Sequence, residues 1–142
     1  MHPRLKAVAA GAAAALVWGA LEPIDRRLFR HDYSDIAVLG KAFTRGRGWR
    51  PLGFAIHALN GALFGAVYYE IAQRVRRDPR RLALELALLE HVTLFPTGRL
   101  VDLHHPARGE PGVVELFSAP AFAQATVRHA LFGAVLGALA AD

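Results

Sequence analysis

Two histidines occupy equivalent places in two copies of one short segment. HALNGALFGA begins at His57 and HALFGAVLGA begins at His129, and the two share the same spacing of glycine and alanine after the histidine. Neutral imidazoles ligate haem iron and transition metals. Paired histidines in a doubled segment therefore predict a cofactor site formed by His57 and His129, with haem or a transition metal as the group they would hold.

A second group of candidate chemical residues lies between the two copies. Glu90 and His91 are adjacent in the segment LALELALLEHVTLF. Carboxylate and imidazole groups both ligate metals and both transfer protons. Glu90 and His91 are therefore the candidate catalytic residues and, together with His57 and His129, the candidate metal ligands. The chain has no cysteine, so no thiolate ligand contributes to this site.

Further polar side chains are scattered through otherwise apolar segments, namely Glu22, Asn60, Gln124 and Arg128. Buried polar groups need partners. We therefore predict a polar network in which Arg128 neutralises Glu22 or Glu90 and fixes the register of the helices, with no bound cofactor. Two alternatives stay open: the haem or metal site, and a pathway for protons, ions or a small solute, since ionisable groups inside membranes often line one.

The elements that must position these residues are long apolar segments. Hydrophobic residues make up 54% of the chain, and the charges gather in clusters such as RRLFRHD, TRGRGWR and RVRRDPRR. A bilayer demands this separation of charged and apolar segments. The sequence therefore predicts an all-α integral membrane protein in contact with the lipid bilayer, because helices satisfy their own backbone groups there.

Four membrane spans are predicted, since about 20 apolar residues cross roughly 30 Å of hydrocarbon. They cover about residues 5–24, 51–72, 80–101 and 119–141. The first has the basic start of a signal peptide but is interpreted as a retained helix, with a cleaved signal as the alternative. The third begins after Asp78 and Pro79 and contains Glu85 besides Glu90 and His91, so we expect the other three spans to surround it.

The doubled segment predicts a doubled hairpin within one transmembrane domain, residues 1–142. Hairpin repeats at about 5–75 and 78–142 would form a four-helix bundle with parallel repeats. Gly61 and Gly65 recur as Gly133 and Gly137, and such small-residue faces let helices pack closely in lipid. The same faces could bind a membrane-protein partner or a second copy of the chain.

The loops and the net charge limit the remaining possibilities. The segment SDIAVLGKAF, which starts at Ser34, predicts either a short helix at the membrane surface or an ordinary polar loop. The net charge is +5, but no nucleic-acid-binding motif is present, so the arginine clusters are assigned to lipid headgroups. His104 and His105 are expected to be solvated.

Orientation and function are the least constrained properties of the sequence. The short basic segments predict both termini in the cytoplasm of a multi-pass protein of the cell (inner) membrane. No serine, cysteine or lysine nucleophile has an activating partner in the sequence, and whether the protein is an enzyme stays open. The favoured function is an accessory or interaction component of the membrane.

Overall fold

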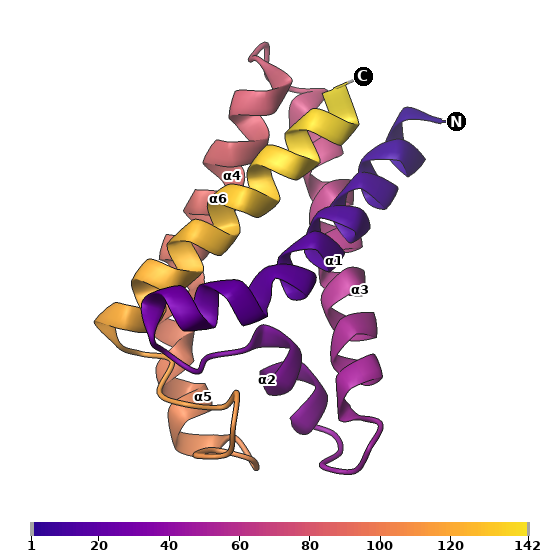
Figure 1. Cartoon of the computed structure of the whole chain (residues 1–142). Coiled ribbons are helices and arrows are strands. Elements are labelled where there is room, and N and C mark those ends of the chain that lie inside the picture. Colours follow the sequence, from indigo (N-terminus) through magenta and orange to yellow (C-terminus); the bar gives the residue numbers. More distant parts are fainter. Residues whose placement is uncertain (1, 142) are drawn as a thin grey trace.

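The chain is an all-α bundle in the computed structural model, which describes residues 2–141. Its helices are α1 (Pro3–Phe29), α2 (Asp35–Lys41), α3 (Trp49–Ala72), α4 (Pro79–Leu94), the 3₁₀ turn η1 (Phe95–Thr97), α5 (Gly98–His104) and α6 (Ala119–Ala141). Both chain ends and the turn between α3 and α4 lie at one end of the bundle, and α2 and α5 lie at the other (Figure 1).

Three helices, α1, α3 and α6, are long and apolar enough to cross a membrane. The predicted spans 51–72 and 119–141 agree closely with α3 and α6. The predicted span 5–24 lies within α1, which continues to Phe29. This extension adds more than a turn of helix and brings further acidic and basic residues onto α1.

The predicted third span, residues 80–101, is not one continuous helix. It begins as expected, with the Asp78 carboxylate accepting a hydrogen bond from the backbone N–H of Arg81 at 2.8 Å. However, α4 ends at Leu94 and the chain passes through η1, which contains Pro96, before α5 begins. Proline has no N–H and its ring collides with the preceding turn of a helix. The 16 residues of α4 rise only about 24 Å, and α4 is not among the long apolar helices.

Glycines bring α1 and α3 into backbone contact. A Cβ atom added at Gly65 would lie 2.1 Å from the carbonyl oxygen of Ala7, and one added at Gly11 would lie 2.0 Å from that of Gly61. No side chain fits at such separations. The glycines of α3 therefore form the α1–α3 interface, as expected for close helix packing in lipid.

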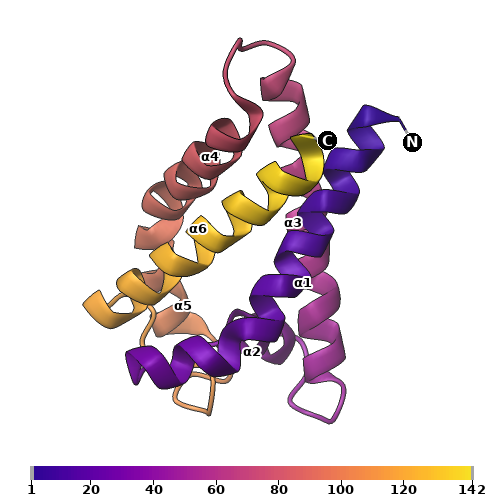
Figure 2. The same ribbon diagram turned by 45° about the horizontal axis from the view of Figure 1, so that its top comes forward.

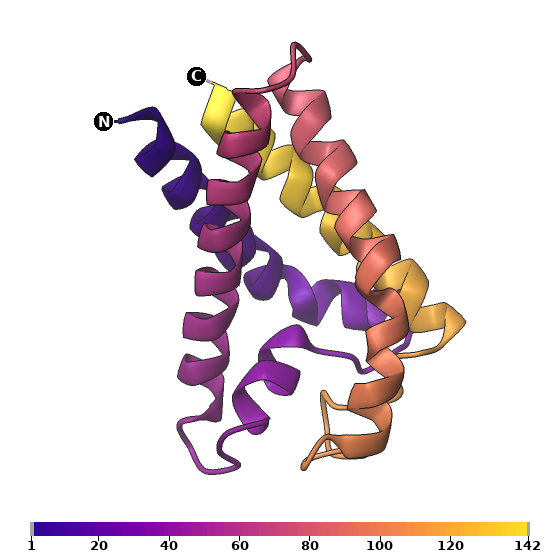
Figure 3. The ribbon, with the colours of Figure 1, turned by 180° about the vertical axis from the view of Figure 1, so that it is seen from behind.

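The equivalent glycines of α6 pack on α4. A Cβ atom at Gly133 would lie 2.7 Å from the Cα of Leu84, and one at Gly137 would lie 2.9 Å from the Cα of Arg80. Helices α1 and α6 also contact each other, whereas α3 and α4 contact each other very little, as the view from behind shows (Figure 3). The small-residue faces predicted to bind partners are thus filled within the chain.

The two long connections pack together into what we call the cap, residues 30–48 and 105–118. The cap contains α2, which packs on α3. Of the two predictions for this segment, a short helix and an ordinary polar loop, the helix is confirmed. The Ser34 N–H donates to the Gly112 carbonyl at 2.9 Å, and Lys41 Nζ lies 3.2 Å from Glu110 Oε2. Figure 2 shows α2 beneath the end of α1.

His105 is a buried part of the cap and is not solvated as expected. The Ala107 N–H donates to His105 Nδ1 at 3.0 Å, so Nε2 carries the proton and donates to the Val38 carbonyl at 2.8 Å. The Nε2 bond therefore joins the two cap segments, whereas the Nδ1 bond lies within one of them.

Candidate functional site

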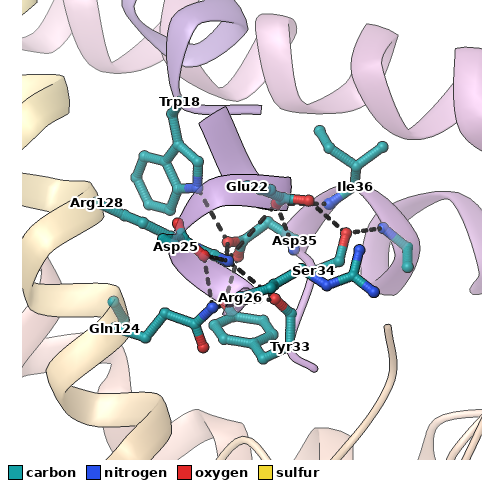
Figure 4. A network of polar contacts seen from close by, with 12 residues as sticks. Trp18, Glu22, Asp25, Arg26, Tyr33, Ser34, Asp35, Ile36, Gln124 and Arg128 are labelled. Atoms are coloured by element: carbon teal, nitrogen blue, oxygen red, sulfur yellow. Dashed lines mark hydrogen bonds and ion pairs between the residues drawn. The ribbon is translucent and has the colours of Figure 1, made fainter. Parts of the chain in front are cut away.

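The polar centre of the molecule is the guanidinium of Arg128 on α6, which is only 2% exposed. Its Nε and Nη2 donate to the two carboxylate oxygens of Asp25 at 2.6 Å each. Its Nη1 donates to Asp35 Oδ2 at 2.7 Å, and Nη2 also donates to the Tyr33 carbonyl at 2.9 Å (Figure 4). We call Arg128 and its acidic neighbours Glu22, Asp25 and Asp35 the arginine cluster. The paired bonds to Asp25 are the strong, planar arrangement that arginine favours.

Glu22 on α1 joins the arginine cluster to the start of α2. Its Oε1 lies 3.6 Å from Arg128 Nη1 and accepts hydrogen bonds from the backbone N–H groups of Asp35 at 2.7 Å and Ile36 at 3.3 Å. The Ser34 hydroxyl donates to Glu22 Oε2. The first N–H groups of a helix have no partner inside it and attract negative charge. A side chain of α1 therefore caps α2.

Two further side chains complete the shell around the carboxylates. Gln124 Nε2 donates to Asp25 Oδ1 at 2.6 Å. The guanidinium of Arg128 lies 4.8 Å from the ring centre of Tyr33, and the hydroxyl of Tyr33 donates to Asp35. Burial, together with the charge of Asp35, raises the pKa of Tyr33 well above 10, so Tyr33 keeps its proton as a donor.

Asp35 is held as a carboxylate. Burial by itself would raise the pKa of Asp35, but the positive charge of Arg128, together with smaller contributions such as the hydrogen bond from Tyr33, outweighs burial and holds that pKa below the ordinary value of 3.8. The indole N–H of Trp18 also donates to Asp35 Oδ2 at 3.1 Å. The carboxylates outnumber the guanidinium, and neutral donors such as Trp18 supply the remaining hydrogen bonds.

A row of aromatic rings crosses the bundle next to the arginine cluster. Trp18 on α1 contacts His57 on α3 at 5.0 Å between ring centres and His129 on α6 at 4.7 Å, both edge to face. His129 stacks on His91 of α4 at 4.8 Å, and His91 contacts Phe122 at 4.7 Å. The two repeated histidines therefore both contact the indole of Trp18.

Glu90 and His129 form a close pair on the other side of this row. His129 Nδ1 donates to the Ala125 carbonyl at 2.8 Å, so a neutral His129 presents an unprotonated Nε2, which lies 3.9 Å from Glu90 Oε2. His91 Nε2 bonds to the Thr126 hydroxyl at 2.9 Å. Across residues 2–141, no group of three or more His, Asp or Glu side chains is arranged to hold a metal ion.

A cavity of about 390 Å³ lies beside the aromatic row, between α1, α3, α4 and α6. His57, Asn60, Glu90 and His129 line it, and Asn60 reaches the protein surface. The Nε2 atom of His57 is buried and has no hydrogen-bond partner within the described residues. The cavity therefore contains polar groups that the protein itself leaves unsatisfied.

Several predicted site residues come together and others do not. Glu22, Gln124 and Arg128 meet in the arginine cluster, as the predicted network requires, whereas Glu90 pairs with His129 and Asn60 faces the cavity. Sequence reasoning missed Asp25 and Asp35 because both lie beyond the predicted end of the first span. The signal for Asp25 was its position three residues after Glu22, which places both on one face of a longer helix.

Comparisons with known proteins found no family model, no curated protein and no solved structure that matches this chain. The candidate site contains two distinct parts, the arginine cluster, whose charged groups pair with each other, and the cavity, where His57 Nε2 has no partner.

Proposed function

We propose that this protein is an accessory or interaction component of the cell (inner) membrane. The observation that supports this function best is the arginine cluster, which joins α1, α2 and α6 through Arg128, Glu22, Asp25 and Asp35. Its charged groups pair with one another, and the cluster fastens α2, hence the cap, to the long apolar helices. A cap held in one position outside the lipid is suited to binding a partner protein.

The proposed architecture is one transmembrane domain, residues 1–142, made of two hairpin repeats. Gly61 and Gly65 pack on α1 in the same way that Gly133 and Gly137 pack on α4, which supports the doubling. In this arrangement α4 and the residues after it form the fourth span. The first helix is retained, because Trp18, Glu22 and Asp25 of α1 supply core and cluster contacts.

The proposed orientation places both termini in the cytoplasm. The two chain ends and the basic turn RVRRDPRR lie at the same end of the bundle (Figure 1). Short basic segments favour the cytoplasmic side. The cap then lies on the opposite face of the membrane.

The alternative of a haem held by His57 and His129 has less support. Both imidazoles contact the Trp18 ring edge to face, and the indole N–H is bonded to Asp35. Paired axial ligation would require His57 and His129 to give up these ring contacts. An absorption spectrum of protein purified from cells supplied with haem precursors tests this alternative, and a Soret band lost in His57→Ala would restore it.

The accessory role is tested by site-specific photo-crosslinking in native membranes. Phe43 in the cap is 75% exposed, and a photoreactive residue there should give an adduct of one defined mass. The same residue at Leu136, which is fully buried, is the matched control and should give none. Arg128→Leu should weaken the Phe43 adduct by releasing the cap. If Phe43 and neighbouring cap positions give no adduct, the accessory role is wrong.

A further inference from the structure

The cavity beside α3 and α4 contains two polar groups that lack partners at mid-membrane depth. Asn60 is the twelfth of the 24 residues of α3, and its carboxamide makes no hydrogen bond with any residue in the described range. His57 is 8% exposed, and its Nε2 atom is likewise unpartnered. Hydrocarbon offers these groups nothing, so each costs free energy unless a polar molecule reaches it.

Glu90 and His129 form a third place in the cavity that lacks a hydrogen-bonding partner, in this case a donor. His129 donates through Nδ1 to the Ala125 carbonyl, so its neutral Nε2 is an acceptor, and it faces the carboxylate oxygen of Glu90, also an acceptor, at 3.9 Å. Two facing acceptors attract a donor. A hydroxyl group placed beside them would donate to one of them and accept from the Asn60 carboxamide.

An apolar groove continues from this cavity along the outside of α3 and α4. Glu90 and Leu94 line both spaces, and the groove of about 450 Å³ extends from them past Leu63, Val67 and Leu89. All three of these side chains are more than half exposed. The residues that line the groove lie on α3 and α4, which diverge from their connecting turn (Figure 3).

The charges around the cavity restrict what binds there. Arg128 donates four hydrogen bonds to Asp25, Asp35 and the Tyr33 carbonyl, and its Nη1 also lies 3.6 Å from Glu22 Oε1, so carboxylates of the protein already neutralise the charge that an anionic headgroup would need. Asp35 and Glu90 both line the cavity and repel negative charge. The volume of about 390 Å³ lies in the range of small-molecule sites, roughly 300–1,000 Å³.

We propose that this cavity and groove bind a single-chain lipid with an uncharged hydroxyl headgroup, which enters from the bilayer between α3 and α4. The headgroup occupies the cavity and bonds to Asn60 and the Glu90–His129 pair. The hydrocarbon chain lies in the groove. This inference goes beyond the accessory role and does not depend on it.

The fluorescence of Trp18 measures lipid binding, because its indole lines the cavity and the chain has only two tryptophans. In a Trp49→Phe background in phosphatidylcholine nanodiscs, a monoacylglycerol with a brominated chain should quench Trp18 fluorescence with saturation. Unbrominated monoacylglycerol should reverse the quenching. The methyl ester of the same fatty acid, which has no hydroxyl, should not.

Two variants connect the quenching to the cavity. Asn60→Leu removes one hydrogen bond from a surface-reaching side chain and should weaken apparent affinity by roughly two- to tenfold. Glu90→Gln should also weaken it, because the new amide N–H supplies the donor that His129 lacks. The matched control is Glu85→Gln on the same helix, which bonds to Arg77 and lines neither the cavity nor the groove.

Three results would overturn the proposal. If quenching rises linearly with the concentration of brominated monoacylglycerol, as it would with brominated phosphatidylcholine, Trp18 contacts only the bulk lipid. If both Asn60→Leu and Glu90→Gln leave the apparent affinity unchanged, the lipid does not bind in this cavity. Equal or stronger binding of a brominated fatty-acid anion or phosphatidylglycerol would contradict the uncharged headgroup. Loss of the Phe43 adduct has no bearing on these measurements, so the two proposals fail independently.

Discussion

Replacing Arg128 by leucine is the most direct test of the arginine cluster. The substitution removes two hydrogen bonds to Asp25, one to Asp35 and one to the Tyr33 carbonyl, all 2.6–2.9 Å long. It leaves carboxylates buried without a positive partner. Removal of one member of a buried ion pair costs about 3–5 kcal/mol. For a chain of this length, that corresponds to a fall in Tm of roughly 10–20 °C.

The measurement is thermal unfolding in one detergent, followed by circular dichroism. Arg77→Leu is the matched control, because its ion pair with Glu85 is 63% and 52% exposed and such pairs contribute about 0–1 kcal/mol. Much of the loss in Arg128→Leu comes from carboxylates left without a partner. The double variant Arg128→Leu with Asp25→Asn should therefore unfold at a higher temperature than Arg128→Leu alone.

A stabilising arginine cluster is contradicted if Arg128→Leu unfolds within about 2 °C of the unaltered protein, or at no lower temperature than Arg77→Leu. It is also contradicted if Asp25→Asn lowers the Tm of Arg128→Leu by as much as it lowers the Tm of the unaltered protein. Either result would mean that the cluster is hydrated and contributes little to stability.

Three further predictions follow from the packing, the cap and the topology. Gly65→Ala places a methyl group against the α1 backbone and should lose about 1–3 kcal/mol in denaturant unfolding, whereas Gly48→Ala, with open space around it, should stay within about 0.5 kcal/mol. The pKa of Asp35 is lower in the folded state than its ordinary 3.8, so its carboxylate stabilises the fold above about pH 4 and this contribution fades as the pH falls further. The difference in Tm between the unaltered protein and Asp35→Asn should therefore shrink as the pH falls below about 4. The chain has no cysteine, so single cysteines at Arg76 and Arg47 should react with a membrane-impermeant maleimide from opposite sides of sealed vesicles, and labelling from one side would refute the arrangement.

The sequence predicts the long apolar helices well because their signal is local. Residues 51–72 and 119–141 contain few charges over the length that a bilayer requires, and α3 and α6 match them. The predicted third span is broken because Pro96, late in the segment, ends the regular helix. A span predicted from the length of an apolar segment takes no account of the effect of proline on a helix.

The candidate site is harder to predict because its partners are distant in the chain. Arg128 and Glu22 were correctly assigned to one network, since a buried charge demands an opposite one. The stronger partner, Asp25, was missed because α1 was expected to end near residue 24. The contact of Trp18 with both His57 and His129 depends on how α1 crosses α3 and α6, and no spacing in the sequence encodes that crossing.

The distance along the chain between Arg128 and its acidic partners has a consequence for assembly. Asp25 precedes Arg128 by 103 positions, so the ribosome completes α1 and α2 long before the guanidinium exists. Until α6 enters the membrane, Glu22 and Asp25 need water around them, since an unpaired carboxylate does not tolerate an apolar setting. The C-terminal helix therefore completes the arginine cluster last. A chain that ends before α6 would leave the acidic residues of α1 without their partner, so this part of the protein would stay hydrated and accessible to proteases.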